Sequence, residues 1–267
     1  MTTPTRPARL ELFLLAHHDD EVFCAGHLRR ALDGGGRVRL LWATAGGLAP
    51  ARSRLAEGAR VLDVLSLPTS AAVDLGLPDQ HAVEHVGAIA REVGRLLDEG
   101  HRGGDRRDGD DRDGDAVVYV PAYEGGHPDH DAVNLAAALA VAARPGLQAV
   151  EFPLYRRGPF GLTVQQPSPA AGTSPERCVV LPLSDSDLAL RHALARANAS
   201  QFVPSLLPLL ALARWAGRGR AEPARPLPAH DYARPPHPGR LLYELYTPWR
   251  FARWRAAAER SGAAQSP

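Results

Sequence analysis

The stretch LELFLLAHHDDEVFCAGHL, residues 10–28, decides how this chain can fold, because an apolar run ends abruptly in a row of ionisable side chains. Residues 9–16 have the continuous apolar character of a buried strand. Residues 21–32 carry apolar side chains at helical spacing, and three glycines then follow as a stop signal. We therefore expect the ionisable residues 17–20 to lie between a strand and a helix, at the carboxyl end of the strand.

Strand-like and helix-like segments alternate through the first half of the chain, and the signals weaken beyond residue 156. We expect strands at 37–44, 70–76, 116–122, 147–155 and 178–184, helices at 51–65, 81–98, 131–143 and 185–201, and irregular structure at 216–239. Strands that alternate with helices form parallel βαβ units. The sequence therefore predicts an α/β fold with a Rossmann-like, doubly wound, mostly parallel sheet and helices on both faces.

The domain organisation that we expect is a single domain over residues 1–267. Residues 98–115, DEGHRGGDRRDGDDRDGD, have the mixed charged and glycine-rich composition of a flexible loop. The apolar segment 202–213 is too short and too rich in proline to span a bilayer, and we expect it to pack or to cover a pocket. Residues 202–267 are accordingly expected to form a C-terminal lid or cover.

The composition excludes several classes of function. All 31 cationic residues are arginine, so enzymes that need a lysine for a Schiff base, for pyridoxal phosphate or for a Walker-type phosphate site are excluded. The formal net charge of +1 gives no reason to expect nucleic acid as a partner. Two distant cysteines form neither a zinc finger nor a disulfide framework, and no apolar run predicts a secretory signal or a transmembrane segment. We therefore expect a cytoplasmic protein; its oligomeric state is left open.

Two clusters of polar residues follow predicted strands, HHDD at 17–20 and HPDH at 127–130. Each cluster alone has a structural explanation, because aspartates and a proline suit the first turn of a helix. Both clusters, however, are expected at the same edge of the sheet, where doubly wound proteins bind their ligands. The pair therefore indicates an active site more strongly than either cluster does alone.

The spacing within the two clusters suits a catalytic metal. Zinc in an enzyme takes three protein nitrogen or oxygen ligands and keeps one position for water. His17, Asp20 and His130 would supply two imidazoles and one carboxylate. Asp19 would then be free to take a proton from the bound water, and His127 would face the reacting carbonyl group from the other side. The residues by themselves predict a metal-dependent hydrolase.

The motifs AHHDDE at 16–21 and GGHPDH at 125–130 resemble those of the PIG-L/LmbE-like zinc-dependent N-deacetylases, whose signatures read AHPDDE and HPDH. RLAEGARVL at 54–62, LGLPDQ at 75–80 and LARANASQ at 194–201 are similar to later motifs of that family, so the resemblance covers most of the first 200 residues.

The resemblance implies a role for each matching residue. It implies His17, Asp20 and His130 as ligands of Zn²⁺, or of another divalent metal such as Fe²⁺. It implies Asp19 as general base and His127 as the residue that stabilises the oxyanion and assists the leaving amine. Two residues that would contact the sugar are Arg54 and Asp79.

The function implied is removal of the N-acetyl group from an N-acetylglucosamine-type amino sugar, in a glycolipid, a thiol-cofactor precursor or an antibiotic precursor. Two alternatives stay open: a non-catalytic sugar-binding or regulatory domain, and an amidase that acts on a bulkier acyl group or a thiol conjugate. The chain departs from the family at His18, where the usual residue is proline. We expect this histidine to be a tolerated replacement that points away from the metal.

Overall fold

The computed structural model describes residues 9–47, 49–102, 116–168 and 178–263. Its centre is a seven-stranded sheet in the order β3-β2-β1-β4-β5-β9-β8, in which neighbouring strands from β3 to β5 run parallel and β9 and β8 are antiparallel additions. The strands are β1 (Leu10–Leu15), β2 (Arg37–Thr44), β3 (Ala72–Leu77), β4 (Ala116–Pro121), β5 (Gln148–Phe152), β8 (Val179–Pro182) and β9 (Ala221–Pro226). The predicted α/β architecture with a mostly parallel sheet is confirmed.

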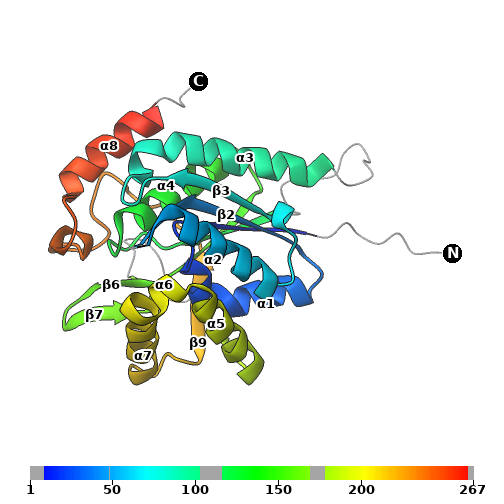
Figure 1. The fold of residues 1–267 in the computed structure, drawn as a ribbon. Helices are drawn as coiled ribbons and strands as arrows, with labels where there is room; N and C mark the ends of the chain where they lie inside the picture. Colours follow the sequence, from blue (N-terminus) through cyan, green and yellow to red (C-terminus); the bar gives the residue numbers. More distant parts are fainter. Residues whose placement is uncertain (1–8, 48, 103–115, 169–177, 264–267) are drawn as a thin grey trace.

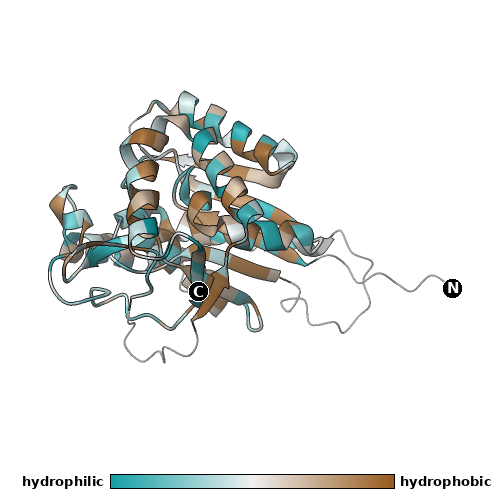
Figure 2. Cartoon of the chain, turned by 90° about the horizontal axis from the view of Figure 1, so that it is seen from below, coloured by the Kyte–Doolittle hydropathy of each residue, from teal (hydrophilic) through white to brown (hydrophobic). Residues whose placement is uncertain are grey.

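Helices cover both faces of this sheet (Figure 1). One face is covered by α3 (Val86–Arg102), α4 (Pro128–Ala142) and α8 (Phe251–Ala263), and the other by α1 (Ala25–Asp33), α2 (Ala51–Val64) and α5 (Asp185–Ala197). Successive side chains of β1 serve the two layers in turn: Leu12 and Leu14 pack with the first set, Phe13 and Leu15 with the second. The helices in Figure 2 carry alternating hydrophobic and hydrophilic stretches, because only one side of each packs on the sheet.

The early elements agree closely with the expected ones, and three later ones do not. The predicted strand 147–155 is too long: β5 ends at Phe152, and the chain then enters a separate hairpin of β6 (Tyr155–Gly158) and β7 (Gly161–Val164). Pro153, which has no N–H group to donate to a neighbouring strand, lies at this break.

The prediction of irregular structure at 216–239 is wrong for Ala221–Pro226, which form β9 between β5 and β8. The strand was not predicted because its charged residues and prolines interrupt the apolar pattern that is typical of a strand. Its Glu222 and Arg225 are both buried, and each is paired with a buried residue of opposite charge, Arg191 and Glu151 respectively. Pairing of this kind lets charged side chains enter the interior of a sheet protein.

The helix predicted at 185–201 begins as expected, with Ser184 as its N-cap in a capping box with Asp187. It is interrupted after Ala197, and the chain continues through the short α6 (Ala199–Gln201), a π-helical turn (Phe202–Leu206) and α7 (Leu207–Trp215). The predicted loop 98–115 begins later than expected, because α3 extends to Arg102, and residues 103–115 lie outside the described part of the chain. Within the ranges given above, no helix is both long and apolar enough to cross a membrane.

Candidate metal centre and active site

The two polar clusters meet at one edge of the sheet, because β1 and β4 are parallel neighbours. The first cluster follows the carboxyl end of β1, and the second forms the start of α4, where His127 is the N-cap residue. A cavity of about 570 Å³ opens here, lined by side chains that include His17, Asp19, Asp20 and His127. The structure therefore brings together residues that lie more than a hundred positions apart.

The turn that carries Asp19 is held in an unusual backbone conformation. Asp19 has φ of 131°, a region that side chains other than glycine rarely occupy and that costs about 1–3 kcal/mol. The fully buried Glu21 stabilises this turn: its Oε2 accepts a hydrogen bond from the Asp19 N–H at 3.0 Å, and its Oε1 accepts one from Asn198 Nδ2 at 2.6 Å. The acidic run after β1 thus contains one residue that shapes the turn and two that face the site.

Three buried side chains that the sequence predicted as metal ligands, His17, Asp20 and His130, lie close together, and we call them the metal group. Asp20 Oδ1 lies 3.1 Å from His130 Nε2 and 3.7 Å from His17 Nδ1. The other carboxylate oxygen, Asp20 Oδ2, accepts hydrogen bonds from the Ala16 and His17 N–H groups, which fixes the direction of Oδ1. The potential ligand atoms of the three side chains all lie within 4.8 Å of one another. Two imidazoles and a carboxylate are a donor set that zinc prefers, so these residues fit a divalent metal.

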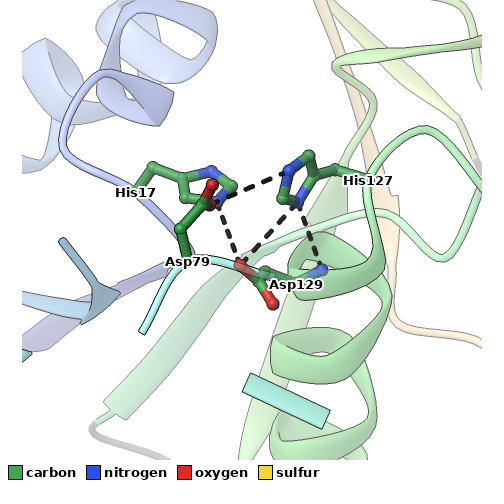
Figure 3. Close-up of side chains that lie close together, drawn as sticks. All are labelled: His17, Asp79, His127 and Asp129. Carbon is green, nitrogen blue, oxygen red and sulfur yellow. Dashed lines mark hydrogen bonds and ion pairs between the residues drawn. The ribbon is translucent and has the colours of Figure 1, made fainter. Parts of the chain in front are cut away.

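The far side of the His17 ring faces a second group of side chains, shown in Figure 3. His17 Nε2 lies 3.3 Å from Asp129 Oδ2 and 3.4 Å from Asp79 Oδ1, and His127 Nε2 lies 4.0 Å from the same Asp79 oxygen. Gly46 packs so closely that a Cβ there would lie 2.6 Å from His17 Cδ2. A carboxylate on the second ring nitrogen is the usual way in which a metal-binding histidine is oriented. Asp129 therefore holds His17 with Nδ1 turned toward Asp20.

The carboxylates around the metal group set its charge. Burial opposes a positive charge on His17, but hydrogen bonds to Asp129, Asp20 and Asp79 outweigh it and raise the pKa of His17 well above its usual value. Burial likewise opposes the charge on Asp20, and the neighbouring His130 and His17 hold its pKa well below the usual range. These carboxylates therefore favour a positive charge at the His17 ring.

Asp19 and His127, the two candidate catalytic groups, have pKa values displaced in opposite directions. Burial raises the pKa of Asp19 to about 8, although the nearby Arg54 guanidinium favours its ionised form. Burial and the charge of His17 lower the pKa of His127 to about 3, so its imidazole is neutral. For Asp79, burial raises the pKa, but hydrogen bonding to His17 outweighs this and lowers it to about 2. Displaced pKa values in a cavity are typical of catalytic sites.

Arg54, predicted to contact the substrate, lies behind Asp19 and not in the cavity wall. Its side chain is fully buried, and Nη2 lies 3.3 Å from Asp19 Oδ1 while Nη1 donates to Glu57 Oε2. Glu57 in turn accepts hydrogen bonds from the backbone and the hydroxyl group of Ser200. The two later motifs, in α2 and at α6, thus meet at one polar contact. Asp79, the other predicted contact, does line the cavity.

His18 points away from the metal group, as expected. It is 1% exposed, its Nε2 lies 2.7 Å from Asp74 Oδ2, and its ring stacks on Trp42 with 4.3 Å between the centroids. The side chain therefore ties the turn to β2 and β3 instead of reaching the cavity.

The sequence did not single out Asp129, Tyr155 or Tyr246 as residues of the site. Asp129 was read only as a first-turn residue of a helix, although its place inside HPDH is a signal that it faces the same site. Tyr155 and Tyr246 line the cavity, and the Tyr246 hydroxyl donates to the Gly126 carbonyl at 2.7 Å. Side chains of the π-helical turn and α7 form a further wall, among them Leu206. The expectation that 202–213 would cover a pocket is consistent with this position.

The doubly wound sheet, with buried histidines and aspartates grouped at its strand ends, places this protein among the α/β proteins that have a candidate divalent-metal centre. Residues 12–141 match the model of the PIG-L family, described as GlcNAc-PI de-N-acetylase. This part of the chain is a PIG-L family domain, as its motifs predicted. No curated protein matches the chain significantly in sequence.

Solved structures of similar fold include deacetylases. The zinc-inhibited form of teicoplanin deacetylase Orf2 is 19% identical and has a TM-score of 0.57, with 81% of this chain and 97% of that chain covered. The A40926 pseudoaglycone deacetylase Dbv21 is 19% identical with a TM-score of 0.55, covering 83% and 97%. The conserved protein TT1542 from Thermus thermophilus is 22% identical with a TM-score of 0.56, covering 91% and 99%. At these identities the likeness concerns the fold.

Proposed function

We propose that this protein is a metal-dependent N-deacetylase that removes the acetyl group from an N-acetylglucosamine-type amino sugar. The observation that carries the proposal is the convergence of a buried two-histidine, one-aspartate group with Asp19 in a single cavity. The cavity volume of about 570 Å³ is of the size that accommodates small ligands. The family of residues 12–141 supports a deacetylase as the class of enzyme.

His17, Asp20 and His130 would hold the metal, which in a hydrolase lowers the pKa of water and polarises the carbonyl group. Asp19 accepts the proton of the attacking water, because its carboxylate faces the cavity and is not consumed as a ligand. Its raised pKa of about 8 makes it a stronger base than an ordinary aspartate. The same carboxyl group then returns the proton to the departing amine.

His127 acts as a neutral hydrogen-bond donor. Its Nδ1 accepts the Asp129 backbone N–H at 3.3 Å, so the ring proton lies on Nε2, the atom that approaches Asp79. A neutral donor in this position stabilises the negative charge that develops on the carbonyl oxygen. The low pKa of about 3 argues against His127 as the group that protonates the amine, and this assigns that step to Asp19.

Arg54 positions Asp19, and Asp79 remains as a contact to the sugar. The buried guanidinium holds Asp19 Oδ1 from behind, which leaves the other carboxylate oxygen for the water. Asp79 is 32% exposed in its side chain and lies in the cavity wall, where a carboxylate can accept hydrogen bonds from sugar hydroxyl groups.

Acetate release from a panel of N-acetylated amino sugars tests the proposal, with metal content measured on the same samples. We expect release by the metal-loaded protein and none above background after treatment with a chelator, with recovery on adding zinc or Fe²⁺. Absence of acetate release from every sugar, with one metal ion bound per chain, would contradict the proposal and favour a sugar-binding domain.

A further inference from the structure

A second cavity, of about 930 Å³, lies beside the catalytic one. It is bounded by the β6–β7 hairpin, the end of α7 and residues 237–240. We call it the arginine groove, because its lining contains four arginines, Arg156, Arg157, Arg218 and Arg240, and no aspartate or glutamate among the described residues. Leu162 of β7 lines both cavities, so the two adjoin at this side chain.

The four arginines lack the carboxylate partners that other arginines of this protein have. Within the described ranges, none of them forms an ion pair, and the hydrogen bonds of their guanidinium groups go to uncharged oxygens. Arg156 donates to the Arg157 carbonyl, Arg157 to the Arg240 carbonyl and Arg240 to the Glu244 carbonyl. Arg218 donates to the Gln166 side-chain amide oxygen. Their positive charge is therefore available to a ligand.

Arg156 gives the second, independent indication of a ligand. This arginine is only 8% exposed, and its buried Nε has no hydrogen-bond partner among the residues that the structure describes. Its Nη1 donates to the Arg157 carbonyl, and no carboxylate lies within ion-pair distance of its guanidinium in the described part of the chain. A buried guanidinium without such a partner is costly unless an anion completes its contacts.

The walls of the arginine groove are apolar and aromatic as well as basic. Phe160, at the tip of the hairpin, is fully exposed, and Trp215, at the end of α7, is 84% exposed. Leu162 between the cavities is 43% exposed. Aromatic rings beside guanidinium groups suit a flat apolar body that carries a negative charge.

We propose that the arginine groove binds an anionic, apolar extension of the substrate, a carboxylate or phosphate on an aromatic or aliphatic body, while the sugar occupies the catalytic cavity. This inference rests on the proposed function for the position of the sugar. The binding of the extension itself rests on the four unpaired arginines and the two exposed aromatic rings. An arginine guanidinium donates two parallel hydrogen bonds to either kind of anion, so both belong to one ligand chemistry.

Direct binding to the full chain tests the groove independently of catalysis. The probes are biphenyl-4-carboxylate, biphenyl-4-yl phosphate and the neutral biphenyl-4-carboxamide, measured by calorimetry with and without bound metal. We expect at least one anion to bind about tenfold or more tightly than the amide, a difference of about 1.4 kcal/mol. The comparison of carboxylate with phosphate shows which anion the groove prefers.

Two double variants test where the anion binds. Arg156→Gln/Arg218→Gln should weaken anion binding about tenfold or more. Arg157→Gln/Arg218→Gln should weaken it as well, and because this variant leaves the buried Arg156 in place, its loss of binding would not result from a folding defect at Arg156. Arg91→Gln is the matched control, because Arg91 is an exposed arginine on α3, which covers the other face of the sheet (Figure 1). Both double variants should keep the melting temperature within a few degrees of the wild type, and the control should bind as the wild type does.

Activity then connects the groove to the substrate. We expect kcat/KM for an N-acetylglucosaminide with a carboxybiphenyl aglycone to exceed that of the carboxamide analogue, and the ratio to fall about tenfold in Arg157→Gln/Arg218→Gln but not in Arg91→Gln. Absence of acetate release from both compounds would contradict the proposed deacetylase function. The calorimetric data would still show whether the groove binds anions.

Three results would overturn the inference: equal binding of the amide and the anions, binding only to anionic phospholipid vesicles, or a dimer that Phe160→Ser and Trp215→Ser dissociate.

Discussion

Replacing Asp19 by Asn tests the assignment of the general base more directly than any other change. Asparagine has the same size as aspartate and tolerates positive φ, so the turn with φ of 131° remains accessible. Its side-chain oxygen can still accept the hydrogen bond that Arg54 Nη2 donates over 3.3 Å. The substitution therefore removes the proton acceptor and changes little else in the geometry of the site.

The expected loss follows from what a general base contributes. Positioned proton transfer accounts for about 10²–10⁴-fold in rate, which corresponds to about 2.7–5.5 kcal/mol in the barrier. We expect kcat of Asp19→Asn to fall within this range with little change in KM, because Asp19 acts on the water and not on the sugar. Metal content should stay at about one ion per chain, since Asp19 is not among the three proposed ligands.

The assay is steady-state acetate release, with metal content determined on the same preparation. Asp74→Asn is a suitable control, because it also removes one carboxylate near the turn, but Asp74 contacts His18 and does not line the cavity. Turnover of Asp19→Asn within about tenfold of the wild type, at full metal content, would refute the assignment of Asp19 as base.

Three further predictions concern the metal ligands, His18 and pH. Asp20→Ala and His130→Ala should each lose metal and activity together, which metal analysis after dialysis would detect; a variant that keeps its metal would contradict the ligand assignment. His18→Pro should keep turnover within about tenfold, but its free energy of unfolding should fall by about 1–3 kcal/mol, because a buried hydrogen bond to a carboxylate is lost. Metal-free protein should lose stability as pH rises above about 6.5, since the pKa values of His17 and Asp19 are raised in the folded state and both groups keep protons that the unfolded chain releases. Thermal melts at several pH values after chelation measure this, and a melting temperature that rises from pH 6.5 to 8.5 would contradict it.

The parallel core of the fold could be predicted from the sequence because local and global signals agree there. β1 and β2 are apolar runs between clear helix and turn signals, and their bounds in the structure differ from the expected ones by at most a residue or so. β9 could not be predicted, because its stability depends on partners remote in sequence. Glu222 is accommodated by Arg191 of α5 and by the N–H groups of Gly26 and His27 at the start of α1. The sequence of the six residues of β9 alone does not indicate these contacts.

The candidate site shows the same division. The spacing of the histidines and aspartates was sufficient to predict that His17, Asp20 and His130 would lie together, and the structure places them so. The buried position of Arg54 could not be predicted in this way, because the sequence around an arginine is the same whether its side chain contacts a ligand at the surface or forms a buried ion pair. Only the packing of α2 against residues 198–201 shows that its guanidinium is enclosed.

The arrangement of Arg54 and Glu57 also favours Asp19 as a base. Burial and the carboxylates of Asp20 and Glu21 raise the pKa of Asp19 to about 8, and a cation nearby favours the ionised form that accepts a proton. A guanidinium fixed by Glu57 and the Ala45 carbonyl supplies that cation without reaching into the cavity. Arg54 thus stabilises the charge of Asp19, whereas the arginines that we propose as anion-binding groups have no carboxylate partner of this kind in the described part of the chain.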